Sequence, residues 1–187
     1  MERSTGRAWK RWAGVALGLA VLVGALFVPM PAGTTRIVSV VDIARPPSLV
    51  YAYVTTPAHW PLWHPSSLGV IGDAGHSLDV GETVEEDFQV AGRRGRATWR
   101  VTAREPDKVW RIAGQINGRD SGTVSYTVAP NASGGTQFVR EFEYGAHSLL
   151  FAFLNAVTLR GQIEEESATA VRRLKERLER PSSGSQV

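Results

Sequence analysis

Two charged residues stand at positions where the sequence otherwise predicts apolar side chains. Glu86 and Arg140 each fall on the apolar face of a segment in which apolar and polar residues alternate. Burying an unpaired charge is costly, so each side chain needs a partner or a route to water. The two either pair with each other or reach solvent at a sheet edge, or they orient the polar end of a bound ligand. Both are therefore candidate polar anchors for a ligand.

The other chemistry-bearing side chains do not form a catalytic or metal-binding motif. The sequence has 4 histidines and no cysteine. His59 and His64 are separated by five positions around two prolines, which is not a zinc-ligand spacing. His64 could act as a general base at a pocket mouth, but a surface or capping histidine fits the same position. We predict no catalytic residue, no metal and no cofactor. We expect a binding protein rather than an enzyme, although the residues leave that question open.

Length and charge narrow the class of protein. A chain of 187 residues, 43% hydrophobic and 21% charged, fits one globular domain with a core. The formal net charge is +3, and residues 1–32 account for all of it, because they hold four basic side chains and one acidic one. The rest of the chain is neutral overall and offers no long-range attraction to phosphate backbones. Nucleic acid is therefore not an expected partner.

The N-terminal segment carries an unbroken apolar run from Ala13 to Val28. Sixteen residues span about 24 Å as a helix, against a bilayer core of about 30 Å, and Trp12 and residues 29–33 extend the run. Basic residues flank only its start, which favours a cytoplasmic N-terminus. We predict a signal anchor over residues 1–33, with one transmembrane helix. The domain would lie on the extracytoplasmic side of a bacterial inner membrane. The alternative is a cleaved signal peptide and secretion.

The remaining sequence predicts one domain over residues 34–180 and a disordered tail over 181–187. A strand at residues 35–44 is followed by a short helix at 48–56, and alternating strands then occupy 82–144. An antiparallel sheet with one apolar face needs a cover, and the amphipathic segment Glu164–Glu179 supplies it. We therefore predict an α+β fold in which a curved antiparallel sheet wraps around a long C-terminal helix.

Aromatic side chains gather on the predicted apolar faces and in the proline-rich turn that ends at Pro65. These rings either fill a core or line a pocket. Ligand pockets are mainly apolar, with a few polar groups that orient the ligand. The candidate pocket residues are Trp60, Trp63, Phe88, Trp99, Trp110, Tyr126, Phe138, Arg140, Phe142 and Tyr144.

The order of these elements resembles the START-like (SRPBCC) superfamily, in its polyketide cyclase/dehydrase and lipid-transport type. The segments that carry the resemblance are Ile43–Pro65, Gly134–Tyr144 and Glu164–Glu179. The resemblance implies a helix-grip fold, in which the long helix closes an apolar cavity in the sheet. Its members include lipid carriers, hormone receptors and a few cyclases, so the resemblance implies a pocket rather than a particular reaction.

These observations together predict membrane-tethered binding of a hydrophobic small molecule, such as a lipid, a quinone or a polyketide-like compound. One alternative is a cyclase/dehydrase-type enzyme that acts on such a ligand. Another is an interaction module without a ligand. The expected partners are the small molecule and, through the N-terminal helix, the membrane; the sequence does not identify protein partners.

Overall fold

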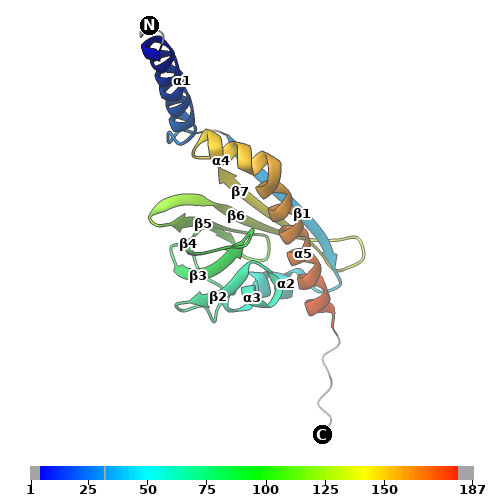
Figure 1. Cartoon of the computed structure of the whole chain (residues 1–187). Helices are drawn as coiled ribbons and strands as arrows, with labels where there is room; N and C mark the ends of the chain where they lie inside the picture. Colours follow the sequence, from blue (N-terminus) through cyan, green and yellow to red (C-terminus); the bar gives the residue numbers. More distant parts are fainter. Residues whose placement is uncertain (1–4, 32, 181–187) are drawn as a thin grey trace.

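One curved sheet dominates the fold. The computed structural model describes residues 5–31 and 33–180, so the predicted tail at 181–187 lies outside the described residues. Seven antiparallel strands follow the order β1-β7-β6-β5-β4-β3-β2 (Figure 1). Helix α5 (Arg160–Glu179) packs across β1 at one end of this order. This arrangement confirms the predicted α+β, helix-grip architecture. The strands are β1 (Thr34–Ile43), β2 (Ser67–Ile71), β3 (Thr83–Val90), β4 (Arg93–Glu105), β5 (Val109–Ile116), β6 (Arg119–Pro130) and β7 (Thr136–Gly145).

The strands form where apolar and polar residues alternate, because successive side chains point to opposite faces of a sheet. The inner face carries the buried residues of this alternation. The hairpin between β5 and β6 turns at Asn117 and Gly118, whose φ angles are 52° and 71°. Two positive φ angles are typical of the turn that Asn-Gly favours between twisted strands. The buried inner-face residues of the central strands include Val84, Ala97, Val101, Ile112, Val124 and Val128.

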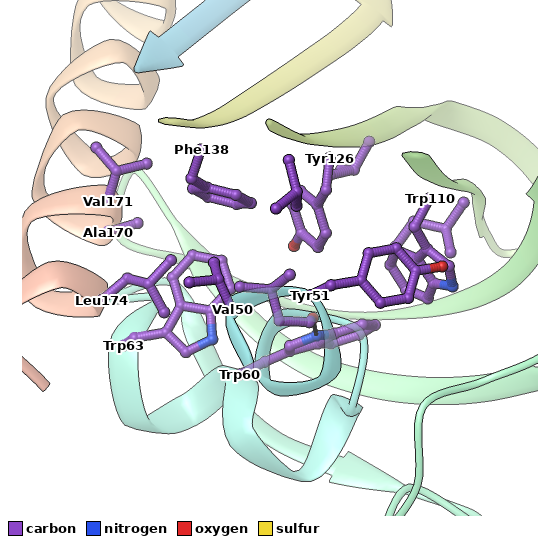
Figure 2. Close-up of a cluster of buried hydrophobic side chains, with 14 of the residues drawn as sticks. Val50, Tyr51, Trp60, Trp63, Trp110, Tyr126, Phe138, Ala170, Val171 and Leu174 are labelled. Carbon is purple, nitrogen blue, oxygen red and sulfur yellow. Dashed lines mark hydrogen bonds between the residues drawn. The ribbon is translucent and has the colours of Figure 1, made fainter. Parts of the chain in front are cut away.

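Side chains fill the space between one end of the sheet and two short helices, α2 (Pro47–Val54) and α3 (Trp60–Trp63). Figure 2 shows the rings of Trp110, Tyr126 and Phe138 packed above these helices. Trp110 and Tyr126 stack with their ring centroids 5.5 Å apart. This end of the sheet interior is therefore a solid core.

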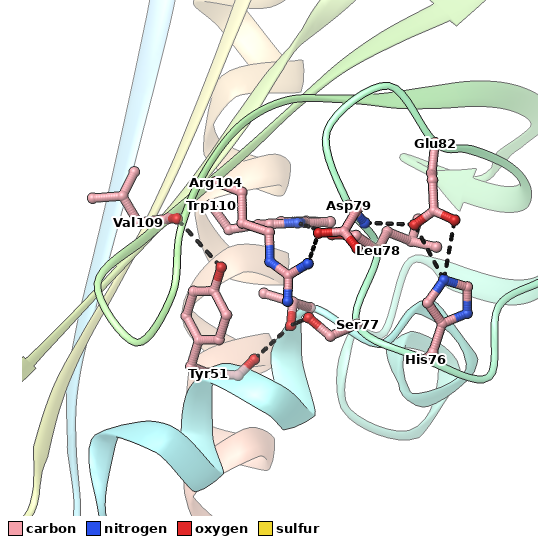
Figure 3. A network of polar contacts seen from close by, with 10 residues as sticks. Tyr51, His76, Ser77, Leu78, Asp79, Glu82, Arg104, Val109 and Trp110 are labelled. Carbon is pink, nitrogen blue, oxygen red and sulfur yellow. Dashed lines mark hydrogen bonds and ion pairs between the residues drawn. The ribbon is translucent and has the colours of Figure 1, made fainter.

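The loop between β2 and β3 closes the same end. The Thr55 hydroxyl, at the end of α2, lies 2.6 Å from the Ser77 hydroxyl, and Arg104 of β4 pairs with Asp79 (Figure 3). The indole N–H of Trp110 donates to the carbonyl oxygen of Leu78 at 3.2 Å. These contacts hold the loop over Trp110 and shield the core from solvent.

The C-terminal helical region begins earlier than the amphipathic pattern predicts. It starts with α4 (Leu149–Leu154), continues through the π-helical turn η2 (Asn155–Leu159) and leads into α5. The Ser148 hydroxyl accepts a hydrogen bond from the Phe151 amide and caps α4. Residues 149–159 are nearly all apolar and lack the polar stripe of a surface helix, so their helical period was not visible in the sequence.

Helix α1 (Thr5–Leu26) projects from the domain beside α4 (Figure 1). Among the described residues, no helix combines the length and the apolar character needed to cross a bilayer. This finding does not support the predicted transmembrane helix.

Candidate ligand-binding cavity

A cavity of about 630 Å³ lies between the inner face of the sheet and the helices α3, η2 and α5. Most of its wall is aromatic or aliphatic. The lining residues Arg93 and Arg94, at the start of β4, and Asn117, in the turn after β5, are exposed, so they mark its mouth. The apolar wall includes Trp60, Trp63, Phe88, Ala97, Trp99, Ile112, Val124, Phe142, Phe151, Leu159 and Ile163.

Most of the sequence-predicted pocket residues lie on this wall. Contact with a ligand stays a prediction for each of them. Two residues do not lie on the wall, namely Trp110 and Phe138, which are fully buried in the solid core described above. They share the correct face of the sheet, but α2 and α3 fill the space above their positions along the strands. The residues on the wall are Trp60, Trp63, Phe88, Trp99, Tyr126, Arg140, Phe142 and Tyr144.

Glu86 is held inside the cavity by a neighbouring indole. The Trp99 Nε1–H donates to Glu86 Oε2 at 2.7 Å. Burial raises the pKa of the Glu86 carboxyl, and hydrogen bonding and the charge of Arg140 only partly oppose this. Glu86 thus lies on the wall as a carboxyl group whose proton is retained to higher pH than usual.

Arg140 projects from β7 and is only 6% exposed. Its Nη1 donates to Ser167 Oγ of α5 at 2.9 Å, and that hydroxyl lies 2.9 Å from Ser39 Oγ of β1. The guanidinium also lies 5.7 Å from the centre of the Phe142 ring, a cation–π distance. Burial lowers the pKa of Arg140, while the neighbouring Tyr126 and Glu86 act against this shift.

Arg140 and Glu86 do not form the ion pair that the sequence left open. Within the described part of the chain, no carboxylate lies within ion-pairing distance of Arg140. The Nε of Arg140 is buried and has no hydrogen-bond partner among these residues. Both candidate anchors therefore face the cavity as separate polar groups.

Three further polar residues lie on the wall. His64 accepts a hydrogen bond at Nδ1 from the Ser66 amide, at 3.3 Å, and burial lowers its pKa well below the ordinary histidine value, with Arg140 and Arg173 adding to the shift. The Ser66 hydroxyl donates to Glu166 Oε2 at 2.5 Å. His64 is thus a neutral imidazole on the cavity wall rather than a surface residue.

Glu166 and Ser167 were missed by the sequence analysis. Both lie on α5, and both line the cavity. Ser167 is four residues before Val171 and is 1% exposed, so it belongs to the buried stripe of the helix. A hydroxyl within an apolar stripe was the available signal, but only the structure shows that Arg140 is its partner.

The cavity contains hydrogen-bonding groups without a metal-binding arrangement. In the described parts of the chain, residues 5–31 and 33–180, no group of three or more His, Cys, Asp or Glu side chains could hold a metal ion. The wall can exclude water from an apolar molecule and can offer it N–H and O–H groups.

A curved sheet that grips a long helix around an apolar cavity defines the START-like class. The family within that class follows from the sequence. Residues 34–179 match the sequence model of the family described as polyketide cyclase / dehydrase and lipid transport, and the chain belongs to this family. No curated protein matches the chain.

Solved structures share this fold at low sequence identity. A START superfamily protein from Mycobacterium smegmatis is 15% identical, with a TM-score of 0.58 over 78% of this chain and 99% of that chain. The Zhui aromatase/cyclase from Streptomyces sp. R1128 is 17% identical, with a TM-score of 0.57 over 81% of this chain and 99% of that chain. DynU16, from the dynemicin biosynthetic locus, is 16% identical, with a TM-score of 0.57 over 77% of this chain but only 47% of that chain. At these identities the likeness shows the fold alone.

Proposed function

We propose that this domain binds a hydrophobic small molecule, such as a lipid, a quinone or a polyketide-like compound, in the cavity between the sheet and α5. The observation that carries the proposal is the cavity itself, about 630 Å³ bounded mainly by apolar side chains. This volume falls within the range of about 300–1,000 Å³ that is usual for small-molecule sites. Family membership supports the same conclusion.

The driving force for binding is the removal of apolar ligand surface from water, worth about 25 cal/mol per Å² before the entropic costs of association. The indoles of Trp60, Trp63 and Trp99 line the cavity and would report occupancy through their fluorescence.

A cavity-filling substitution tests this proposal. Ile163 lies on α5 and lines the cavity, whereas its neighbour Gln162 is exposed and does not. We expect the full-length protein, purified from its host and extracted with organic solvent, to release a hydrophobic compound detectable by mass spectrometry. Ile163→Trp should lower the amount of this compound severalfold, and the matched control Gln162→Trp should not. If the wild type carries no compound and binds no apolar fluorescent probe, the proposal fails.

A cyclase/dehydrase-type reaction is the second candidate function. It is favoured by one observation, the presence of His64, Tyr126 and Arg140 together on the wall of one cavity. A neutral imidazole can accept a proton, and the other two groups can donate hydrogen bonds to an oxygen that gains charge. Turnover of a polyketide-like substrate that is abolished in His64→Gln, with ligand binding retained, would favour the enzyme. No turnover by the wild type would remove this candidate, and retained turnover in the variant would remove His64 as its base.

We further propose that α1 keeps the domain at a lipid surface. Helix α1 carries exposed apolar side chains, among them Trp12, Leu17 and Leu22, and it contacts α4, which carries the exposed Phe153. Full-length protein should float with phospholipid vesicles, and Leu17→Glu should reduce flotation.

Placement on the extracytoplasmic side of a bacterial inner membrane stays a prediction. Fractionation combined with protease accessibility in spheroplasts tests it, and release into the medium would instead indicate secretion.

A further inference from the structure

Three buried N–H donors on the cavity wall have no acceptor within the described residues. They are Nε1 of Trp63, Nε2 of His64 and Nε of Arg140. Since Nδ1 of His64 accepts from the Ser66 amide, the neutral imidazole carries its proton on Nε2. A buried donor without an acceptor costs free energy comparable to a lost hydrogen bond. Three such donors beside one cavity indicate that an acceptor is missing.

The fold brings these donors to one region of the wall. The ring centroids of Trp63 and His64 are 5.6 Å apart, and those of Trp63 and Tyr126 are 6.1 Å apart. Tyr126 lies directly opposite Arg140 in the pairing of β6 with β7. Burial raises the pKa of Tyr126 to about 12, so its phenol keeps its proton at neutral pH and adds another O–H group to this region.

This region also holds two acidic side chains. Glu86 and Glu166 both line the cavity, and both carboxylates oppose the burial-induced fall of the Arg140 pKa. Glu86 Oε2 accepts from Trp99, and both oxygens of Glu166 accept hydrogen bonds, Oε2 from the Ser66 hydroxyl and Oε1 from the Ala91 amide. The acidic groups would therefore repel an anionic ligand head, whereas they would not repel an uncharged acceptor.

We infer that the polar end of the ligand is an uncharged carbonyl-type oxygen that accepts hydrogen bonds from Arg140 and His64. The inference rests on the proposed function and narrows it. The ligand class is an apolar ketone, a quinone or a related neutral carbonyl compound, and not a fatty acid or another carboxylate. The hydrocarbon part fills the aromatic region of the cavity, and the carbonyl lies at the Arg140 end.

Three probes of similar size separate charge from acceptor strength. They are 2-acetylnaphthalene, a neutral ketone; 2-ethylnaphthalene, which has the same ring system and no acceptor; and 2-naphthoate, the carboxylate. Equilibrium dialysis against the full-length protein at neutral pH gives each affinity. We expect the ketone to bind at least about tenfold more tightly than either of the other two, as one hydrogen bond from a charged donor is expected to give.

Variants assign this preference to its donors. Arg140→Met keeps an unbranched side chain but removes the donors, so the ketone should bind no better than 2-ethylnaphthalene. His64→Phe should reduce the ratio severalfold. Ile163→Ala is the matched control, because it lowers all three affinities through lost apolar contact and leaves their ratios unchanged.

The outcomes distinguish this inference from the proposed function. Equal binding of the ketone and 2-ethylnaphthalene to the wild type, or tightest binding of 2-naphthoate, overturns the carbonyl assignment and leaves hydrophobic binding intact. If none of the three probes binds, the cavity function fails and the inference fails with it. The wild-type comparison decides the matter even if Arg140→Met does not fold.

Discussion

Replacing Asn155 with alanine should destabilise the domain and loosen the helical segment that borders the cavity. Asn155 begins the π-helical turn η2 and is only 7% exposed. The Tyr144 hydroxyl donates to its Oδ1 at 2.6 Å, and its Nδ2 donates to Thr35 Oγ1 at 2.8 Å. A single amide therefore ties η2 to β7 and β1. π-helical turns are rare, so a specific side-chain tie is a physical reason for this one to persist.

The magnitude follows from the two hydrogen bonds. Each contributes about 0.5–1.5 kcal/mol, and the loss leaves Tyr144 and Thr35 partly unsatisfied. We therefore expect Asn155→Ala to lower the free energy of unfolding by about 2 kcal/mol, which for a chain of this size is about 4–8 °C in Tm. Urea unfolding followed by tryptophan fluorescence measures the change.

Two further variants make the test specific. Thr158→Ala lies in the same turn but is exposed, with its hydroxyl bonded only to the Leu154 carbonyl, and should change stability by less than about 0.5 kcal/mol. Tyr144→Phe should cost about 1 kcal/mol alone and less in the Asn155→Ala background, because the two residues share one bond. Additive effects, or an Asn155→Ala variant as stable as the wild type, would refute the reasoning.

Three other predictions concern titration and backbone geometry. Burial raises the pKa of Glu86, so the folded state holds the carboxyl proton more strongly than the unfolded chain does, and stability falls as pH rises above the ordinary glutamate pKa. Glu86→Gln should remove this loss of stability when unfolding is measured at several pH values above that pKa. The pKa of His64 is lowered well below 6.5, so the unfolded chain takes up the proton first and stability falls as pH drops below about 6.5; His64→Gln should flatten this slope, and an unchanged slope would contradict the assignment. Gly122→Ala should cost about 1–3 kcal/mol, because the residue has φ of +138° and a Cβ would lie 2.5 Å from the Glu143 carbonyl oxygen; Gly69→Ala, with open space around it, is the control for thermal melts.

The sheet and its hairpins could be predicted because they depend on local patterns. The alternation around Trp99 and Val101 and the Asn117-Gly118 turn each specify conformation within a few residues. The helical segment 149–159 could not be predicted in this way, since its period has no polar face and its stability comes from contacts such as Asn155 with Tyr144.

The candidate site was predicted only in part, for a related reason. Alternation places Trp110 and Tyr126 on the same face as the cavity, but it does not say how far along each strand the covering helices fill the interior. Trp110 lies under the loop at Leu78 and belongs to the core, whereas Tyr126 also reaches the cavity. Assigning Trp110 to the core and Tyr126 to the cavity therefore requires knowing where α2 and α3 lie.

The sequence by itself determined which faces of the strands are apolar, which charges interrupt them and where the tight turn lies, because these properties follow from residue order and backbone geometry. Only the tertiary structure decided that Arg140 meets Ser167 and no carboxylate, that the His64 ring lies on the same wall, and that the space between sheet and helix stays open. Those facts depend on contacts between residues far apart in the chain, and local pattern carries no information about the distance between such residues.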